Sequence, residues 1–152
     1  MDPKLLVIIA AALCIIVCAA AALYSIKTCA PALASVTAEK PELGSKLLIT
    51  IILGEALAIY GLLIAFMIIA RVPAIALMEA ADAEYAAIQT LTASVTMSST
   101  AVIASIGIAY CGPAMMTAAA EKPQSFTTNI LGLVLSEALA IYGLLIAFML
   151  NG

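Results

Sequence analysis

The thirteen-residue stretch EALAIYGLLIAFM occurs twice in the chain, at residues 55–67 and again at residues 137–149. Each copy begins with a glutamate that lies inside a long apolar run. The repeat extends beyond this stretch, because a shift of 82 residues also aligns AEKP at 38–41 with AEKP at 120–123 without a gap. Such a long internal repeat predicts that the chain is two copies of one structural unit.

The composition predicts that these units lie in a membrane. Hydrophobic residues make up 66% of the 152 residues, charged residues make up 10%, and the mean hydropathy is +1.23. A soluble domain is about a quarter charged, so this class is excluded. Four apolar runs, at residues 5–25, 47–70, 87–110 and 130–150, are long enough to cross a bilayer, which takes about 20 helical residues.

Each unit is predicted to be a helical hairpin, the first at residues 1–74 and the second at 75–152. The expected fold class is therefore an all-α membrane protein with four transmembrane helices in two tandem hairpins. The turns AEKPELGSK and AEKPQSFTT contain the proline that ends each first helix. Small residues in the first helix of each hairpin predict a closely packed layer, whereas the Leu- and Ile-rich second helices suit a lipid-facing layer.

The charges of the loops predict the orientation. The two turns hold Lys40, Lys46 and Lys122, whereas the connection RVPAIALMEAADAEYAAIQ has one arginine against three acidic residues. Because positively charged loops stay in the cytoplasm, we expect both turns to be cytoplasmic and the termini outside. In a prokaryote, the location would be the cell membrane. A cleaved signal peptide at the N-terminus is disfavoured, since its removal would take away the first helix of the repeat.

Glu55 and Glu137 are the candidate ion-binding residues. Each lies eight or nine residues into its apolar run, near the bilayer midplane, where an acidic side chain costs about 3 kcal/mol. A buried acid that holds helices together would explain one such residue, but not two in identical surroundings. Since desolvation disfavours the charged form, each carboxyl is expected to keep a proton in lipid and to release it to water or to a cation. The chain has no His and a net charge of −3, which gives no reason to expect a nucleic-acid partner.

Other polar residues are candidates for supporting roles. Tyr60 and Tyr142 follow the two acids by five residues, about 140° around the helix, and are expected either to bond a carboxyl of their own or a neighbouring subunit or to anchor a helix interface. Lys27 lies at a depth comparable to Glu55 and is expected either to pair with it or to extend toward a polar surface. The four cysteines have no CxxC spacing, which favours inert thiols over a metal site or disulfides.

Together these features resemble the proteolipid subunit, c or K, of V-type and archaeal A-type rotary ATPases and ATP synthases. The resemblance covers nearly the whole chain and rests on the duplicated hairpin, a proline fourteen residues before each acid, and Glu-x-x-x-x-Tyr-Gly at residues 55–61 and 137–143. It implies a ring of copies in membrane lipid that turns against a stator subunit of the a or I type carrying an arginine. A central-stalk subunit would bind the cytoplasmic turns.

The resemblance also implies that Glu55 and Glu137 carry the ion, with no cofactor and no catalysis by this chain alone. The first hairpin of eukaryotic V-type relatives usually lacks the acid, and its presence here implies more ions for each turn of the ring. Protons are the expected ion, because the residues after each acid are Ala and Leu, whereas sodium-binding members supply extra oxygens. Sodium remains the alternative, with Thr28, Ser105 and Tyr110 as further oxygen ligands.

Two other functions fit the sequence less well. A small proton-coupled secondary transporter with two pseudo-symmetric hairpins would also use intramembrane acids. The second helices, however, lack the proline interruptions that build a substrate site. A purely structural membrane protein would leave both acids unexplained.

Overall fold

The computed structural model describes all residues from Met1 to Gly152 and contains no β-strand. Four long helices and four short ones follow one another: α1 (Pro3–Glu39), η1 (Pro41–Leu43), α2 (Gly44–Leu47), α3 (Ile49–Ala70), α4 (Val72–Ile75), α5 (Ala80–Glu121), η2 (Pro123–Ser125) and α6 (Phe126–Asn151). Four helical segments are long and apolar enough to cross a membrane. The predicted fold class, four transmembrane helices in two tandem hairpins, is confirmed.

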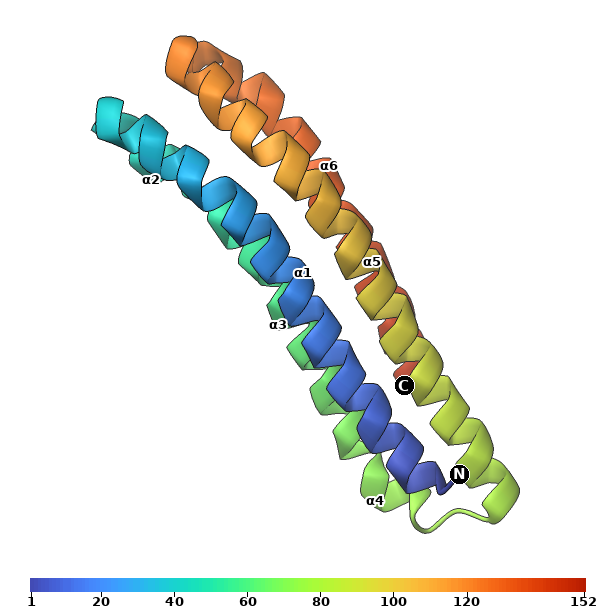
Figure 1. The fold of residues 1–152 in the computed structure, drawn as a ribbon. Helices are drawn as coiled ribbons and strands as arrows, with labels where there is room; N and C mark the ends of the chain where they lie inside the picture. The colour runs from blue at the N-terminus through green and yellow to red at the C-terminus, as the bar shows by residue number, and fades with distance from the viewer.

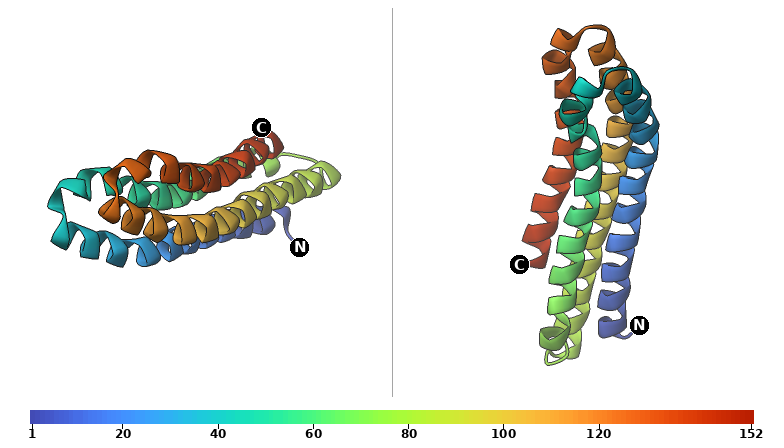
Figure 2. Two further views of the ribbon diagram at one scale, coloured as in Figure 1. Left: turned by 90° about the horizontal axis from the view of Figure 1, so that it is seen from above. Right: turned by 90° about the vertical axis from the view of Figure 1, so that its left-hand side faces the viewer.

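The two hairpins lie side by side, α1 with α3 and α5 with α6 (Figure 1). Both Glu-Lys-Pro turns lie at one end of the bundle, whereas the termini and the connection between hairpins lie toward the other (Figure 2). Each turn begins where a helix stops at Lys40 or Lys122 and a proline opens a short 3₁₀ helix. At the N-terminus, the Asp2 side chain accepts a hydrogen bond from the Lys4 backbone at 2.9 Å and caps α1.

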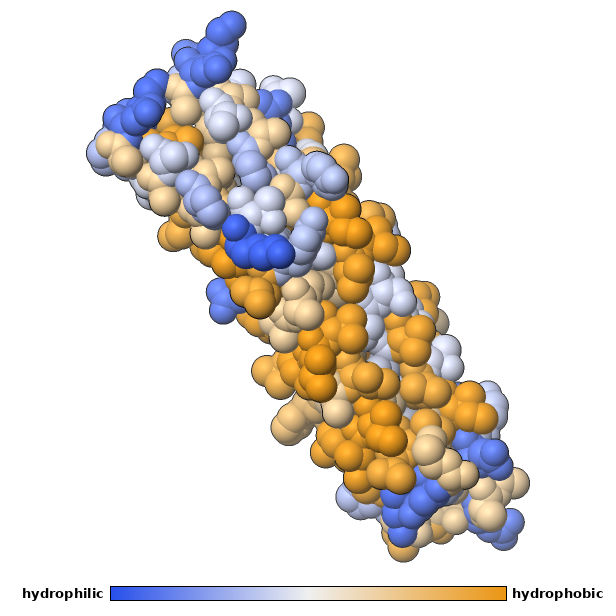
Figure 3. Space-filling model, in the orientation of Figure 1, coloured by the Kyte–Doolittle hydropathy of each residue, from blue (hydrophilic) through white to orange (hydrophobic).

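The first helix of each hairpin is longer than its apolar run. α1 has 37 residues and continues through Pro31, and α5 has 42 residues and continues through Pro113. A helix of this length spans about 55 Å or more, compared with about 30 Å for the hydrocarbon core of a bilayer. The turns therefore extend beyond the lipid. Apolar surface covers most of the middle of the molecule, while hydrophilic residues gather at its two ends (Figure 3).

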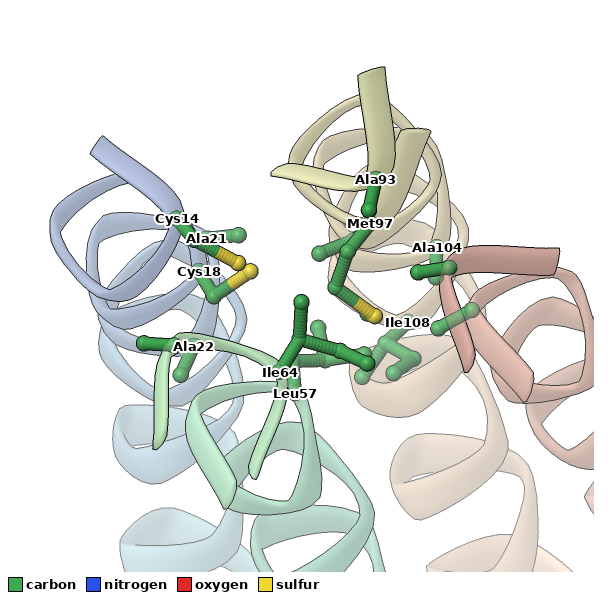
Figure 4. Packing of buried hydrophobic residues seen from close by; sticks show 14 of the residues in the cluster. Cys14, Cys18, Ala21, Ala22, Leu57, Ile64, Ala93, Met97, Ala104 and Ile108 are labelled. Atoms are coloured by element: carbon green, nitrogen blue, oxygen red, sulfur yellow. The ribbon is translucent and has the colours of Figure 1, made fainter. Parts of the chain in front are cut away.

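Small residues allow close packing between the hairpins. α1 packs against both α3 and α5, α5 packs against α6, and α3 and α6 also touch. Cys14 and Cys18 from α1, Leu57 and Ile64 from α3, and Met97 from α5 point toward one another between the hairpins (Figure 4). Other positions on the packed faces of α1 and α5 are fully buried alanines, among them Ala10, Ala87, Ala93, Ala101 and Ala104. Small side chains let membrane helices approach closely enough for extensive van der Waals contact.

Gly and Ser exchange places between the two hairpins. In the first hairpin, a Cβ atom added to Gly54 on α3 would lie 2.7 Å from the Ser25 hydroxyl on α1. In the second hairpin, the glycine is Gly107 on α5, and a Cβ atom added there would overlap Ser136 on α6. The two positions correspond under the 82-residue shift. One glycine in each pair is therefore enough to let the two helices of a hairpin approach closely at this point, and the two hairpins pack in the same way.

A second pair of equivalent contacts lies further along the hairpins. A Cβ atom added to Gly61 would overlap Cys18, and one added to Gly143 would overlap Thr100. These four residues also correspond under the 82-residue shift. Glycine is required at both places because the second helix of each hairpin touches the first one here.

Candidate ion-binding site

Glu137 is an acid on an apolar packing face. The buried residues of α6 recur every three or four positions and are Leu133, Glu137, Ala140, Gly143, Ala147 and Asn151. Glu137 thus lies on the face of α6 that packs against the rest of the protein, with 8% of its surface exposed. A charge at such a position is unfavourable unless hydrogen bonds or a cation compensate it.

The Tyr60 hydroxyl supplies a hydrogen bond to this carboxyl, donating to Glu137 Oε1 at 2.8 Å. Tyr60 belongs to α3 and Glu137 to α6, so this bond joins the two hairpins. The angular offset of each tyrosine from the acid on its own helix explains the arrangement. Tyr60 points away from Glu55 and reaches the acid of the neighbouring hairpin.

Glu55 and Tyr142 have different surroundings in the single chain. Glu55 is exposed on α3. Tyr142 is 61% exposed on α6. Of the four residues in the two copies of the motif, the structure therefore brings Tyr60 and Glu137 together and leaves Tyr142 and Glu55 at the surface. The predicted ion-binding role of both acids stays a prediction.

Lys27 does not contact Glu55 in the single chain. Its side chain is exposed, and its ammonium lies 5.0 Å from the centre of the Tyr24 ring on the same helix. A cation over an aromatic face is attracted to it and needs no acidic partner there. Pairing between Lys27 and Glu55 stays a prediction.

The other candidate oxygens for a sodium ion do not reach either carboxyl. The Thr28 hydroxyl donates to the Tyr24 carbonyl at 2.8 Å, and the Ser105 hydroxyl donates to the Val102 carbonyl at 2.8 Å. Tyr110 is 76% exposed. In the single chain these polar groups therefore satisfy their own helices or face outward.

Three cysteines act as buried packing residues. Cys14, Cys18 and Cys29 are buried, Cys111 is half-buried, and all four are unpaired. The Cys14 thiol donates to the Gly61 carbonyl at 3.6 Å, which joins α1 to α3. This arrangement agrees with the expectation of small, buried thiols.

One contact at the turns was not predicted from the sequence. The Lys40 ammonium donates to the carbonyl of Ala120, in the last turn of α5. This bond joins the turn of the first hairpin to the C-terminal end of α5 in the second hairpin. Basic groups near a helix C-terminus commonly satisfy its last carbonyls. The repeated Lys in the two AEKP segments was the available signal, but only the packing of the hairpins shows which carbonyl accepts the bond.

Comparison with known proteins agrees with the duplicated architecture. Residues 9–68 and residues 91–150 each match the model of the family described as the C subunit of ATP synthase. The chain is 29% identical over 128 residues to the 16 kDa proteolipid of the V-type proton ATPase of Ascaris suum, covering 84% of this chain and 78% of the relative. It is 30% identical over 131 residues to a 16 kDa proteolipid of the V-type proton ATPase of Caenorhabditis briggsae, covering 84% and 78%.

The structure is that of a duplicated membrane protein, with two tandem helical hairpins that each match the same family model. Because the two family matches together cover most of its residues, the chain belongs to the family of the ATP synthase C subunit. The resemblance to the proteolipid subunits, predicted from the duplicated hairpin, the proline before each acid and the two Glu-x-x-x-x-Tyr-Gly motifs, is confirmed.

Proposed function

We propose that this chain is the ion-carrying subunit of the rotor ring of a V-type or A-type ATPase or ATP synthase, and that protons cross the membrane by reversible binding at Glu55 and Glu137. The main support is the position of Glu137, a buried carboxyl on the apolar packing face of a membrane helix. An ionisable group in such a place is usually functional. The relatives named as V-type proton ATPase proteolipids support protons as the cargo.

Proton transfer would use the carboxyl in two states. While the ring faces lipid, the carboxyl is protonated and neutral, and the Tyr60 hydroxyl holds the Glu137 side chain in one position. When the carboxyl reaches the stator, its proton leaves to water in one half-channel, and the resulting carboxylate pairs with the arginine of the stator. A proton from the other half-channel then restores the neutral acid. Each cycle moves one proton for each carboxyl.

The surroundings of Glu137 favour a proton over a sodium ion. The Tyr60 hydroxyl is the side-chain group that hydrogen-bonds to this carboxyl. A sodium ion needs several oxygen ligands, as hard cations do. A protonated carboxyl needs only one or two hydrogen-bond partners, and Tyr60 supplies one of them.

The partners and the orientation follow from the same proposal. The chain assembles with other copies of itself, with a stator membrane subunit of the a or I type, and with a central-stalk subunit at the two Glu-Lys-Pro turns. The turns lie at the end of the bundle opposite the termini (Figure 1), and the length of α1 and α5 would place them beyond the hydrocarbon core, where they can bind the stalk. We propose that they lie in the cytoplasm, that the termini lie outside, and that the membrane is the cell membrane if the source is prokaryotic.

The test is ion flux through the intact complex in vesicles. The complex is purified with the wild-type chain or with the double variant Glu55→Gln/Glu137→Gln, and ATP-driven acidification of the vesicles is followed in sodium-free buffer. The wild-type complex is expected to pump protons without sodium, and the double variant to assemble and pump nothing. Pumping by the double variant would refute the proposal. Flux that requires sodium would show that the transported ion is sodium and not the proton.

A further inference from the structure

Cys14 and Cys18 lie one helical turn apart on α1, and their thiols point into the bundle side by side (Figure 4). Both residues are fully buried, and neither forms a disulfide. The Cys14 thiol donates to the Gly61 carbonyl of α3 at 3.6 Å. A Cβ atom added to Gly61 would lie 2.7 Å from the Cys18 sulfur, so the backbone of α3 touches both cysteines. Two thiols and one carbonyl oxygen thus meet between α1 and α3.

A serine of α5 adds a fourth polar group to this cluster. The Ser98 hydroxyl oxygen is buried without a hydrogen-bond partner, and the residue is 9% exposed. The Ser94 hydroxyl donates to the Ala10 carbonyl at 2.7 Å, which fixes the register of α5 on the parallel helix α1. One turn further along both helices, Ser98 lies opposite Cys14, and its hydroxyl neighbours both thiols. A buried hydroxyl without a partner costs free energy, and a bound ion would remove that cost.

The second hairpin shows that helix packing does not require sulfur at these positions. Under the 82-residue shift, Cys14 and Cys18 correspond to Thr96 and Thr100. Thr100 meets a glycine of α6 just as Cys18 meets a glycine of α3. The two threonine hydroxyls donate to carbonyls of α5 at 2.8 and 3.0 Å. The first hairpin therefore carries two thiols where threonine suffices for packing, which directs attention to the chemistry of the sulfur atoms.

The donors of this cluster suit a soft divalent metal ion. Thiolates select zinc or copper(I), whereas Mg²⁺ and Ca²⁺ take six or more oxygens. Two thiolates and a divalent ion form a neutral complex. Copper(I) with the same two thiolates would leave a net negative charge in an apolar interior, which is unfavourable. No group of three or more Cys, His or acidic residues gathers in the chain, so oxygens must supply the other ligands.

We propose that Cys14 and Cys18 bind one Zn²⁺ ion, with the Ser98 hydroxyl and the Gly61 carbonyl oxygen as the other two ligands. Binding breaks two S–H bonds, forms two Zn–S bonds and releases two protons, and it requires no oxidant or reductant. A sulfur and an oxygen at about 2.3 and 2.1 Å from a tetrahedral ion lie roughly 3.6 Å apart. The Cys14 sulfur and the Gly61 oxygen are 3.6 Å apart.

This ion joins α1, α3 and α5, and therefore the two hairpins. All four ligands come from the protein and leave no open position, which is typical of a structural zinc site. Because the thiols are not exposed, the ion has to bind before the hairpins pack together. Neither Glu55 nor Glu137 is a ligand, so the zinc site does not depend on the function proposed above.

The metal content of the assembled ring tests this site. The full chain is produced in cells supplied with zinc, the ring is purified without chelators, and its zinc is measured by elemental mass spectrometry. We expect one zinc ion per chain in the wild type and none in Cys14→Thr/Cys18→Thr, which carries the residues of the second hairpin. The matched control, Cys29→Ser/Cys111→Ser, is expected to keep its zinc. A wild-type ring without zinc, or equal zinc in the Cys14→Thr/Cys18→Thr ring, would overturn the proposal.

X-ray absorption at the zinc edge identifies the ligands in the same wild-type sample. We expect two sulfurs at about 2.3 Å and two oxygens at about 2.0–2.2 Å. A ligand shell without two sulfurs would overturn the proposal.

The variant Ser98→Ala keeps both thiols and tests the oxygen ligand. It is expected to lose zinc to a competing chelator at a concentration at least tenfold lower than the wild type, since even groups that only support a ligand contribute about 10–100-fold to metal affinity. Unchanged retention of zinc would overturn the assignment of this hydroxyl. None of these measurements involves proton flux, so a failure of the proposed function would leave their outcome unchanged.

Discussion

The two copies of EALAIYGLLIAFM have the same thirteen residues but different surroundings. Glu137 is 8% exposed and bound by Tyr60, whereas Glu55 is exposed and Tyr142 is 61% exposed. The difference arises because the first hairpin covers one face of the second, and nothing in the same chain covers the corresponding face of the first. In a repeat protein, a unit depends on its neighbours to bury its faces. The surroundings of the two acids are therefore set by position along the chain.

Single substitutions of Glu55 and Glu137 are expected to have the largest effect, which is on proton flux. They test whether the two acids, which have different surroundings in the single chain, differ in function in the assembled ring. Glu137→Gln and Glu55→Gln are each expected to reduce ATP-driven proton flux to background, because a glutamine cannot load or release a proton and both hairpins must pass the stator. Flux is measured in vesicles with assembled complexes. Near-normal flux in Glu55→Gln, with none in Glu137→Gln, would mean that the exposed acid does not carry ions.

Substitution of the helix-contact glycines tests whether the two hairpins pack alike. Gly61→Ala and Gly143→Ala each add a methyl group that overlaps Cys18 or Thr100. Overpacking of this kind costs about 1–3 kcal/mol, so both variants should lower the temperature at which the detergent-solubilised ring dissociates. Gly132→Ala is the milder control, because its added methyl group would lie 3.3 Å from the Cys111 sulfur. A clear loss of stability in only one of the two hairpins would contradict equivalent packing.

Substitutions of Lys40 and Lys122 in the two turns should have smaller effects, one on the stability of the single chain and the other on the stability of the ring. Lys40→Met removes the bond to the Ala120 carbonyl within the chain and is expected to cost about 1 kcal/mol in the thermal unfolding of the single chain. Lys122→Met should leave this unfolding unchanged and weaken the ring against dissociation by detergent. If Lys122→Met destabilised the single chain as much as Lys40→Met, the two lysines would not have separate roles within and between chains.

Lys27 should have the smallest effect of these substitutions. Lys27→Met removes an exposed contact with the Tyr24 ring, a type of interaction that contributes about 0.5–1 kcal/mol at most. The rate of carbodiimide labelling at Glu55 in the assembled ring is expected to be unchanged. A rate that changed severalfold, with Glu137 unaffected, would instead support pairing between Lys27 and Glu55.

The fold could be predicted from the sequence because the repeat and the hydropathy are both local signals. The ends of the helices were predicted less well, since residues 5–25 mark only the apolar part of α1, which runs from Pro3 to Glu39. Hydropathy indicates which residues suit lipid, and a helix continues beyond them until Pro41 interrupts its hydrogen bonds.

The acids of the candidate site could be identified from their apolar surroundings, but their partners could not. Tyr60 and Tyr142 are equivalent in the sequence, since each follows an acid by five residues. Which tyrosine meets which acid depends on the relative position of the two hairpins. That position is set by the packing of alanines and glycines on facing helices, for which spacing along one helix gives no information.

The most direct test of the account is to determine which carboxyls in the assembled ring react with a hydrophobic carbodiimide, and how many. Assembled rings are treated with dicyclohexylcarbodiimide, which reacts with protonated acids in the membrane, and labelled peptides are identified by the residue before the acid, Gly54 or Ser136. The account predicts label on both Glu55 and Glu137, with loss of proton flux in step with labelling. Label confined to acids of the turns and the connection, or full labelling at both sites with unchanged flux, would contradict it.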